Sequence, residues 1–242
     1  MTMRVPTEAI ILAGGLGTRL RSVISDVPKP MAPVQGRPFL EHLMDYWIEQ
    51  GIQRFILSVG YLGERIEAHF GNAYRGRSVS YIHEEIPLGT GGGVRQVLLQ
   101  TKWQQAHAVL INGDTWYEVS LPQLVADADS AAQPISIALK PMTHNDRYGG
   151  VGIDSSSRVT EFGIKTTGRC LINGGCYLLD IEAVSSCLRD YPDQFSLEQD
   201  YLVPLAKEGK VAASLQDTTF LDIGIPADYA QALNILGKRL NA

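Results

Sequence analysis

Cysteine is scarce in this chain, and its three copies lack the spacing of a metal or redox site. Cys170, Cys176 and Cys187 form no C-x-x-C pair, and the five histidines are scattered. Disulfide frameworks and zinc sites need paired or closely spaced ligands, so the sequence predicts neither. These features favour a protein made and kept in a reducing cytoplasm.

Long apolar runs are also missing, and positive charge does not dominate. The apolar stretch Ala9–Ala13 is far too short for a signal-peptide core or a membrane span. With 21 Lys and Arg against 26 Asp and Glu, the formal net charge is −5. This charge would repel a nucleic-acid backbone or an anionic membrane surface. A small-molecule partner is therefore expected, with neither nucleic acid nor membrane.

Short apolar segments alternate with helical patterns along most of the chain. Strands are predicted at Ala9–Ala13, Arg54–Val59, Val79–His83, Ala108–Ile111 and Ile135–Lys140. The early strands are continuous apolar runs, which is typical of a sheet covered by helices on both faces. A helix is predicted from Pro38 to about Gly51. We therefore expect an α/β fold with a Rossmann-like, doubly wound, mostly parallel (mixed) sheet.

The pattern changes between Tyr148 and Asp180, where short strands are punctuated by glycine and serine. This segment predicts a small antiparallel insertion. After it, helices are predicted near Glu198–Lys207 and Ala227–Leu236, around a strand near Phe220–Ile223. With 242 residues and no linker, a single domain spanning residues 1–242 is expected.

A glycine-rich turn follows the first predicted strand, at the sheet edge where α/β folds bind ligands. The segment Leu12–Leu20 (LAGGLGTRL) can point backbone N–H groups at phosphate oxygens, and Arg19 adds a permanent charge. Leu20 replaces the third glycine of a dinucleotide fingerprint, and no Gly-Lys-Ser/Thr follows. A dehydrogenase and a Walker loop are thereby disfavoured, and a tight turn with a surface arginine is the alternative. Prolines then present Lys29 as a second phosphate cation.

The glycine loop together with Pro28–Pro30 resembles the signature of the sugar-1-phosphate nucleotidyltransferase family, and the resemblance runs from about residue 8 to about residue 235. It implies the nucleotide-diphospho-sugar transferase fold, with a nucleotide-binding half at about 1–135 and a sugar-phosphate-binding half at about 136–242. The implied reaction transfers a nucleoside monophosphate from an NTP to a sugar 1-phosphate and releases pyrophosphate. The expected nucleotide-binding residues are Leu12, Ala13, Gly14, Gly15, Gly17, Thr18, Glu84, Gly89 and Thr90.

Two aspartates each lie at or just after a predicted strand and close to a glycine, Gly113 and Gly224. Asp114 comes after Ala108–Ile111, and Asp222 lies in Phe220–Ile223, so both carboxylates are expected at one edge of the sheet. Mg²⁺ typically takes one or two protein carboxylates and completes its shell with phosphate and water oxygens. Each aspartate alone is more often a turn former or a helix cap. Both match the family's metal ligands, so the resemblance implies Mg²⁺ as the cofactor.

Three further segments resemble the family's sugar-phosphate site. Lys165 matches the lysine that holds the sugar phosphate, whereas Ile164 stands where many members have a glutamate that contacts sugar hydroxyls. Tyr148 and Gly149 match a tyrosine-glycine strand start, and Asn173 opens an asparagine-glycine turn beside the sugar. Simple hairpin turns are the alternative for these segments, Asn173 excepted.

The base site is expected around Leu88–Gly92, which resembles a family loop that opens a helix, and whose glycines can pack against a flat ring. Glu84 or Glu85 can accept two hydrogen bonds from guanine, because its N1–H and N2–H are paired donors. Ala13–Pro33 is most similar to a family branch that uses GTP and D-glycero-α-D-manno-heptose 1-phosphate. UTP or CTP with another sugar 1-phosphate is the alternative.

The implied catalysis is positioning and charge neutralisation, since the attacking phosphate is already anionic. Arg19 and Lys29 are expected to stabilise the pyrophosphate, and Lys165 to hold the acceptor. The rival is a nucleotide-sugar sensor on the same fold, but it should lack one of these cations or aspartates, and none is lacking. Ser196 and Gln199 have capping-box spacing, so this segment is interpreted as a helix cap and Glu198 is not expected to take part in catalysis. Family members often form dimers or tetramers, which makes a homo-oligomer possible.

Overall fold

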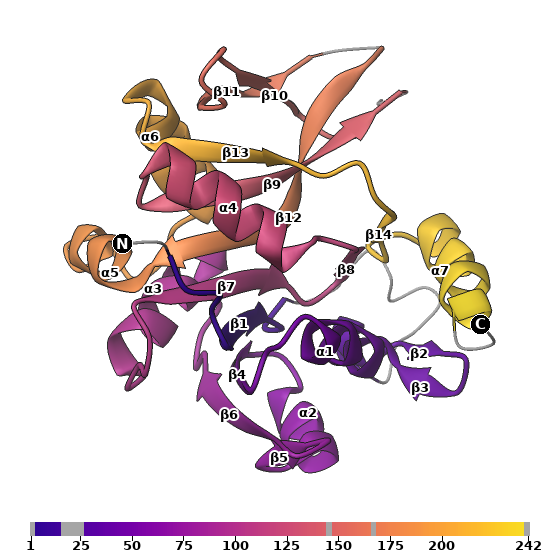
Figure 1. The fold of residues 1–242 in the computed structure, drawn as a ribbon. Helices are drawn as coiled ribbons and strands as arrows, with labels where there is room; N and C mark the ends of the chain where they lie inside the picture. Colours follow the sequence, from indigo (N-terminus) through magenta and orange to yellow (C-terminus); the bar gives the residue numbers. More distant parts are fainter. Residues whose placement is uncertain (1–2, 16–26, 144–146, 166–167, 240–242) are drawn as a thin grey trace.

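A mixed β-sheet covered by helices organises the chain in its computed structural model, which describes residues 3–15, 27–143, 147–165 and 168–239 (Figure 1). Along the main path the strand order is β11-β10-β12-β7-β1-β4-β6-β5, and β9 and β13 continue from β12. The strands of this sheet are β1 (Glu8–Leu12), β4 (Arg54–Val59), β5 (Ala73–Tyr74), β6 (Arg77–His83), β7 (His107–Asn112), β9 (Ile135–Met142), β10 (Gly150–Ile153), β11 (Val159–Ile164), β12 (Cys170–Asp180) and β13 (Val211–Leu215).

The centre of the sheet is parallel, as the continuous apolar strands predicted. Strand β1 lies between β4 and β7 and is parallel to both, and β4 is parallel to β6. The long strand β12 runs antiparallel to β7 and to β9, whereas β13 is parallel to β9. The doubly wound, mostly parallel mixed sheet is therefore confirmed.

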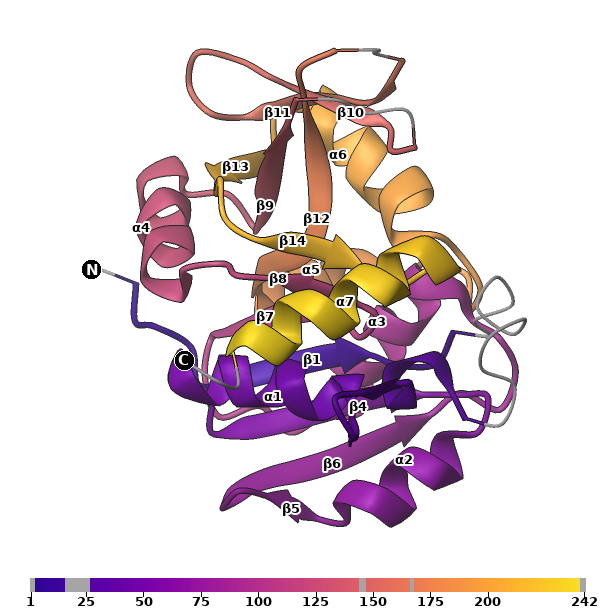
Figure 2. The same cartoon turned by 90° about the vertical axis from the view of Figure 1, so that its right-hand side faces the viewer.

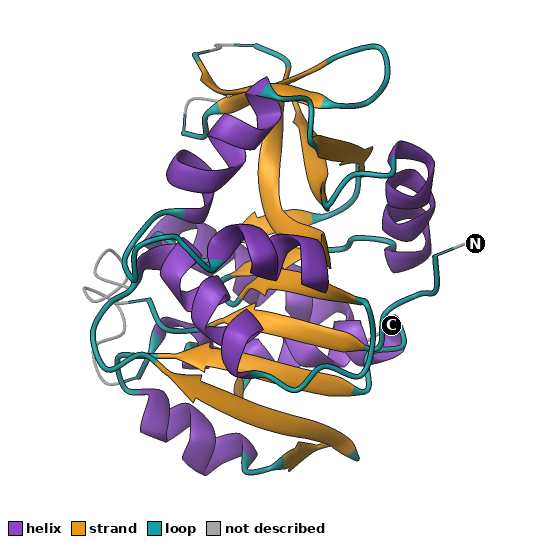
Figure 3. Ribbon diagram, turned by 90° about the vertical axis from the view of Figure 1, so that its left-hand side faces the viewer, coloured by secondary structure: helices purple, strands orange, loops and turns teal. Residues whose placement is uncertain are grey.

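Helices cover both faces of the parallel strands (Figures 2 and 3). Successive strand residues point to opposite faces. Ile11 accordingly packs in a core with residues of α1, α2, α4 and α7, whereas Ile10 packs in a second core with residues of α3 and α5. The helices are α1 (Phe39–Glu49), α2 (Gly63–Phe70), α3 (Gly89–Gln100), α4 (Leu121–Ala131), α5 (Ile181–Leu188), α6 (Val203–Lys207) and α7 (Pro226–Arg239).

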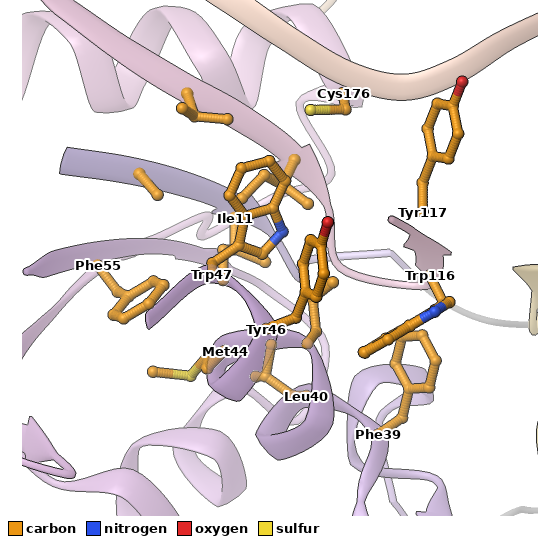
Figure 4. Packing of buried hydrophobic residues seen from close by; sticks show 14 of the residues in the cluster. Ile11, Phe39, Leu40, Met44, Tyr46, Trp47, Phe55, Trp116, Tyr117 and Cys176 are labelled. Carbon is orange, nitrogen blue, oxygen red and sulfur yellow. The ribbon is translucent and has the colours of Figure 1, made fainter. Parts of the chain in front are cut away.

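Aromatic side chains join α1 to a small second sheet that carries part of the site. This sheet pairs β8 (Thr115–Tyr117) with β14 (Phe220–Asp222) in antiparallel register. Trp47 of α1 and Trp116 of β8 are 1% and 2% exposed (Figure 4). The Tyr46 ring lies between them, with its centroid 5.7 Å and 5.3 Å from theirs, and its hydroxyl donates to the Val119 carbonyl at 3.0 Å. The core thereby anchors the β8/β14 ladder.

The predicted antiparallel insertion was drawn too broadly. Strands β10 and β11 do form an antiparallel hairpin, but β12 continues from this hairpin into the central sheet. The expected turn at Asn173 is wrong, because Asn173–Gly175 lies inside β12 as a register irregularity against β9. A Cβ on Gly174 would lie 2.3 Å from the Tyr117 ring, so close packing rather than a turn accounts for this glycine.

The second half of the chain also differs from its predicted helices and strands. The helix expected near Glu198–Lys207 is a π-helix, η3 (Leu197–Leu202), followed by α6. Strand β13 had not been predicted. The α1 and α7 predictions hold to within a few residues, and Gly51 follows α1 with a φ of +102°. Within the described part of the chain, no helix is long and apolar enough to cross a membrane.

Candidate active site

Two adjoining cavities open at the carboxyl edge of the parallel strands. The first encloses about 410 Å³ and is lined by Leu12, Ala13, Gly14, Gly15, Lys29, Pro30, Glu84, Pro87, Gly89, Thr90, Asn112, Asp114 and Gly224. The second encloses about 310 Å³ and is lined by Leu12, Thr90, Asn112, Asp114, Thr115, Tyr148, Asn173, Gly174, Gly175, Tyr177, Leu197, Glu198, Phe220 and Asp222. They share four lining residues, so a ligand in one can contact a ligand in the other.

The described start of the glycine loop is tied to neighbouring strand ends. Ala13 N–H donates to the Ser58 carbonyl at 2.8 Å, and Gly113 N–H donates to the Leu12 carbonyl at 2.9 Å. A Cβ on Gly14 would lie 2.6 Å from a Glu84 carboxylate oxygen, so a larger residue here would displace the Glu84 side chain. Of the predicted phosphate-loop residues, Gly17, Thr18 and Arg19 lie outside the described residues.

Lys29 lies between the two predicted metal ligands where the cavities meet. Its Nζ is 2.5 Å from Asp114 Oδ2 and 3.6 Å from Asp222 Oδ1. The Lys29 side chain is only 10% exposed, compared with 38% for Asp114 and 17% for Asp222. It belongs to a short 3₁₀ turn, η2 (Lys29–Met31), which begins after Pro28. The proline-bounded segment therefore presents one ammonium group to two carboxylates.

The β8/β14 ladder brings these aspartates together from distant parts of the chain. Asp222 pairs with Thr115, and Ile223 N–H donates to the Asp114 carbonyl at 3.0 Å. The Asp222 carboxylate is then oriented by its own turn, because Gly224 N–H donates to Oδ1 at 2.7 Å. Asp114 Oδ1 accepts a hydrogen bond of 3.2 Å from the Thr115 hydroxyl. Both carboxylates are held at the boundary of the cavities.

This donor set suits a hard cation that shares its coordination with a substrate. Across the described ranges, no group of three or more His, Cys, Asp or Glu side chains is placed to hold a metal. Asp114 and Asp222 nevertheless contact the same ammonium nitrogen, so their oxygens are within reach of one ion. Mg²⁺ is commonly bound through one or two carboxylates plus substrate phosphates. The two aspartates fit that pattern, with phosphate or water oxygens completing the shell.

Glu84 borders the first cavity and is already engaged in hydrogen bonds. Its Oε1 accepts from the Ser58 hydroxyl at 3.0 Å, and its Oε2 accepts from Leu88 N–H at 3.1 Å. Each carboxylate oxygen can still accept a further bond. Glu85 is exposed and does not line either cavity. Of the two glutamates considered for the base, only Glu84 is in position.

Two glycines at the start of α3 do not have the expected role of packing against the base. A Cβ on Gly91 would lie 2.2 Å from the Phe195 ring, and one on Gly92 would lie 2.1 Å from the Asp193 carbonyl oxygen. These two glycines therefore pack against the chain itself and not against a base. Gly89 and Thr90 do line the first cavity, at the N-terminal end of α3.

A hydrogen-bond network forms one wall of the second cavity. Asn173 Nδ2 donates to the Tyr177 hydroxyl at 2.9 Å and to Glu198 Oε2 at 3.0 Å. Asn173 Oδ1 accepts from Gly175 N–H at 3.0 Å, which fixes the amide. Burial raises the pKa of Tyr177 well above its ordinary value, so this phenol stays protonated. The network presents a carboxylate and an amide to the cavity.

Tyr148 also lines this cavity. Its hydroxyl donates to Asp222 Oδ2 at 3.4 Å, and its ring packs edge-on against Phe220 with centroids 5.8 Å apart. Burial raises the pKa of Tyr148 to about 12, and the Asp222 carboxylate adds to the shift. The neighbouring Arg147 lies over the Tyr148 ring and forms ion pairs with Asp222 and Asp228.

Lys165 and Gly149 are not among the lining residues. Lys165 is exposed just after β11. Gly149 packs closely against Gly163, because a Cβ added to Gly149 would lie 2.9 Å from the Cα of Gly163. Gly150 pairs with Ile164, which places Lys165 on the same hairpin as Tyr148. The structure thus brings Tyr148 and Asn173 to the second cavity and leaves Lys165 beside it on the hairpin.

Asn112 and Glu198 line the cavities, although neither had been assigned a binding role from the sequence. Asn112 ends β7 and lines both cavities. Its side chain packs against Gly175, since a Cβ on Gly175 would lie 2.4 Å from Asn112 Nδ2. Its position between a strand and Gly113-Asp114 is a sequence signal of a site residue. The helix-cap interpretation of Ser196 is confirmed, because its Oγ accepts from Gln199 N–H at 3.2 Å. However, Glu198 also faces the second cavity, which that interpretation did not include.

The fold and the site together are those of a protein that binds a polyphosphate beside a second small molecule. A doubly wound sheet carries a glycine turn, a half-buried lysine and two aspartates at its carboxyl edge, where α/β folds bind ligands. The second cavity is lined by hydroxyl, amide and carboxylate groups, which suits a polyhydroxylated ligand.

Comparisons with known proteins place the chain in a family. The model of the Nucleotidyl transferase family matches residues 8–239, and the chain belongs to this family. The chain is 44% identical to a D-glycero-alpha-D-manno-heptose 1-phosphate guanylyltransferase of Aneurinibacillus thermoaerophilus, over 93% of this chain and 96% of that protein. It is 40% identical to a protein of the same name from Campylobacter jejuni, over 92% and 96%. A crystal structure of HddC from Yersinia pseudotuberculosis complexed with GMP-PN superposes with a TM-score of 0.81 at 35% identity, covering 96% of this chain and 100% of that one.

Proposed function

We propose that this nucleotidyltransferase transfers GMP from GTP to D-glycero-α-D-manno-heptose 1-phosphate, yielding a GDP-heptose and pyrophosphate. The observation that carries the proposal is the Lys29–Asp114–Asp222 cluster at the junction of two cavities. A phosphate that bridges the cavities at this cluster would meet both a cation and the carboxylates that a divalent metal requires. The names of the two bacterial relatives support the choice of substrates.

The reaction requires a phosphate oxygen of the sugar phosphate to attack the α-phosphorus of GTP. A new P–O bond forms there while the bond between the α-phosphorus and the bridging oxygen breaks, and pyrophosphate leaves with that oxygen. Because all participants are anionic, the chain must reduce their repulsion and align them in line. No protein group needs to remove a proton from the attacking phosphate.

We assign the first cavity to GTP and the second to the sugar phosphate. Gly14, Gly15 and the N-terminal end of α3 border the first cavity and can offer backbone N–H groups to phosphates. Lys29 is placed to contact the phosphate chain once the nucleotide has entered. Arg19 is assigned to the leaving pyrophosphate and Lys165 to the acceptor phosphate, as the family resemblance implies. Tyr148 and Asn173 are assigned to the sugar.

Asp114 and Asp222 would hold Mg²⁺ together with the nucleotide phosphates. When bound, this ion neutralises phosphate charge and polarises the α-phosphate. Gly224 N–H and the Thr115 hydroxyl hold the two carboxylates in position through hydrogen bonds to their other lone pairs. Since GTP is an intracellular metabolite, we propose the cytoplasm as the place of the reaction.

Guanine selection is assigned to Glu84, whose carboxylate lines the first cavity. Glu84→Gln keeps the size of the side chain and removes the charge that pairs with the guanine N1–H and N2–H donors. Glu85→Gln is the matched control, because Glu85 is adjacent, exposed and outside the cavity. A fall in the preference for GTP over UTP in the first variant alone supports the assignment, and equal preferences in both remove it.

The test of the reaction is pyrophosphate release with Mg²⁺ across GTP, UTP, CTP, ATP and dTTP, each paired with a panel of sugar 1-phosphates. The expected result is release with GTP and the manno-heptose 1-phosphate above all other pairs. Release with another pair would keep the reaction and replace the substrates. Nucleotide binding by folded protein without release from any pair would favour the sensor.

A further inference from the structure

Glu198 holds a carboxylate against the wall of the second cavity without a counter-ion among the described residues. Its Oε2 accepts from Asn173 Nδ2 at 3.0 Å, and its Oε1 accepts from Gln199 Nε2 at 3.2 Å. Each oxygen of an ionised carboxylate has two lone pairs, so both oxygens keep one free position. A half-buried carboxylate of this kind is costly to desolvate unless a ligand donates hydrogen bonds to it.

The position of Glu198 is held from two directions. On its own element, Ser196 Oγ accepts from Gln199 N–H, and Asp200 Oδ2 accepts from Ser196 N–H at 2.7 Å. Across the cleft, the Thr90 hydroxyl oxygen accepts from Leu197 N–H at 3.0 Å. Thr90 lies at the start of α3 and lines both cavities. The π-helix η3 is therefore docked on the element that borders the nucleotide, and π-helical turns are frequent at functional sites.

The lining of the second cavity is chemically uneven. The residues it shares with the first cavity include Asp114, next to Lys29, and an acceptor phosphate must come close to this cation to meet the nucleotide. Glu198 and Asn173 lie on the wall formed by β12 and η3. A negative carboxylate repels phosphate and attracts hydroxyl donors, so this wall suits the ring of the sugar.

We propose that Glu198 is a specificity-determining residue that accepts hydrogen bonds from hydroxyl groups of the acceptor sugar, with Asn173 holding its carboxylate in place. This inference rests on the proposed function and goes beyond it by naming the group that reads the sugar. It gives Glu198 no part in the transfer of the nucleotidyl group. Sites built to hydrogen-bond a substrate hydroxyl discriminate strongly against analogues that lack it.

The test compares Glu198→Gln with wild type in steady-state kinetics. Glutamine keeps the size of the side chain and an oxygen for Asn173, but it removes the charge. Hydrogen bonds to charged groups imply a rise of about 10-fold to 100-fold in KM for the sugar phosphate. The KM for GTP and kcat should stay within about twofold. Glu182→Gln, at an exposed glutamate in the first turn of α5, is the control and should change nothing.

A series of monodeoxy acceptors separates recognition from a structural role. With the acceptor that lacks the hydroxyl bound by Glu198, wild type and Glu198→Gln should have the same KM. A variant that is equally impaired with every acceptor, or a variant with an unchanged KM for the full sugar, would overturn the inference. Glu198→Asp, which keeps the charge and shortens its reach, should recover part of the lost acceptor affinity.

The same experiment distinguishes a failure of the proposed function from a failure of the Glu198 assignment. If wild type releases no pyrophosphate with any sugar 1-phosphate, the proposed function fails. If wild type is active but all variants behave alike toward all acceptors, only the assignment of Glu198 fails. Thermal melts of each variant show whether the folded protein is the species being compared.

Discussion

Replacing Lys29 by methionine tests whether this lysine occupies the place that a divalent cation takes when nucleotide is bound. Methionine keeps a long unbranched side chain and removes the ammonium group, which lies 2.5 Å from Asp114 and 3.6 Å from Asp222. The two carboxylates would then lose the cation that they share, and among the described residues only Asp222 would keep an ion pair, with Arg147. The variant should be less stable than wild type, and Mg²⁺ should restore stability without any nucleotide.

The expected size follows from the burial of the cluster. Exposed ion pairs contribute about 0–1 kcal/mol, and breaking a buried pair costs about 3–5 kcal/mol. Lys29 is 10% exposed and Asp114 is 38% exposed, so the pair lies between these cases. We expect a loss of about 2 kcal/mol, which lowers Tm by about 4–8 °C in a domain of this size. Mg²⁺ at 100 times its Kd would raise the unfolding free energy of the variant by about 2.7 kcal/mol.

The assay is thermal unfolding of wild type, Lys29→Met and Lys29→Arg over a range of Mg²⁺ concentrations, with Mn²⁺ binding measured in parallel. Wild type and Lys29→Arg should respond little, because their cation already neutralises the aspartates. Asp222→Asn in the Lys29→Met background should abolish the response. An equal effect of Mg²⁺ on wild type and Lys29→Met would refute the idea that lysine and metal compete for these carboxylates.

Two further predictions concern packing and pH. Gly92→Ala should lower the unfolding free energy by about 1–3 kcal/mol in denaturant melts, because its Cβ would lie 2.1 Å from the Asp193 carbonyl oxygen; an increase, as expected from helix propensity alone, would contradict this packing. The pKa values of Tyr74, Tyr81 and Tyr148 are raised to about 12, mainly by burial. Folded protein therefore holds these protons more tightly than the unfolded chain, whose tyrosines titrate near pH 10. The free energy of unfolding should be unaffected below about pH 10 and should fall as pH rises toward 12. Tyrosinate absorbance reports the ionisation of these side chains, and an unfolding free energy that stays constant while they ionise would contradict the prediction.

Local patterns were enough to predict the parallel core and its ligand-binding edge. The runs at Ala9–Ala13 and Arg54–Val59 became β1 and β4 almost residue for residue, since a strand buried on both faces is apolar throughout. Strand ends then placed Glu84, Asp114 and Asp222 at one edge. The roles assigned to these residues stay predictions, as does the division of the chain at about residue 135.

Packing between distant segments could not be predicted from local sequence patterns. Glycines at 91, 174 and 175 look like turn or loop residues, but each lies where another side chain comes too close for a Cβ. The same limit applies to Glu198, whose capping environment is visible in the sequence while its hydrogen bond to Asn173 spans 25 positions. Strand β13 was missed because its pairing with β9 joins segments that are far apart in the chain.

The pairing of β8 with β14 also sets when the site can exist during synthesis. Most residues that line the first cavity are made before residue 115, but Asp222 and Gly224 emerge more than 100 residues later. A chain cut between β13 and β14 would retain the glycine turn, Lys29 and Asp114 and lose the second carboxylate. Such a fragment would also lack Leu221, Ile223 and Leu236, which are buried in the core, so the second carboxylate and the support of β8 are both supplied only at the end of synthesis.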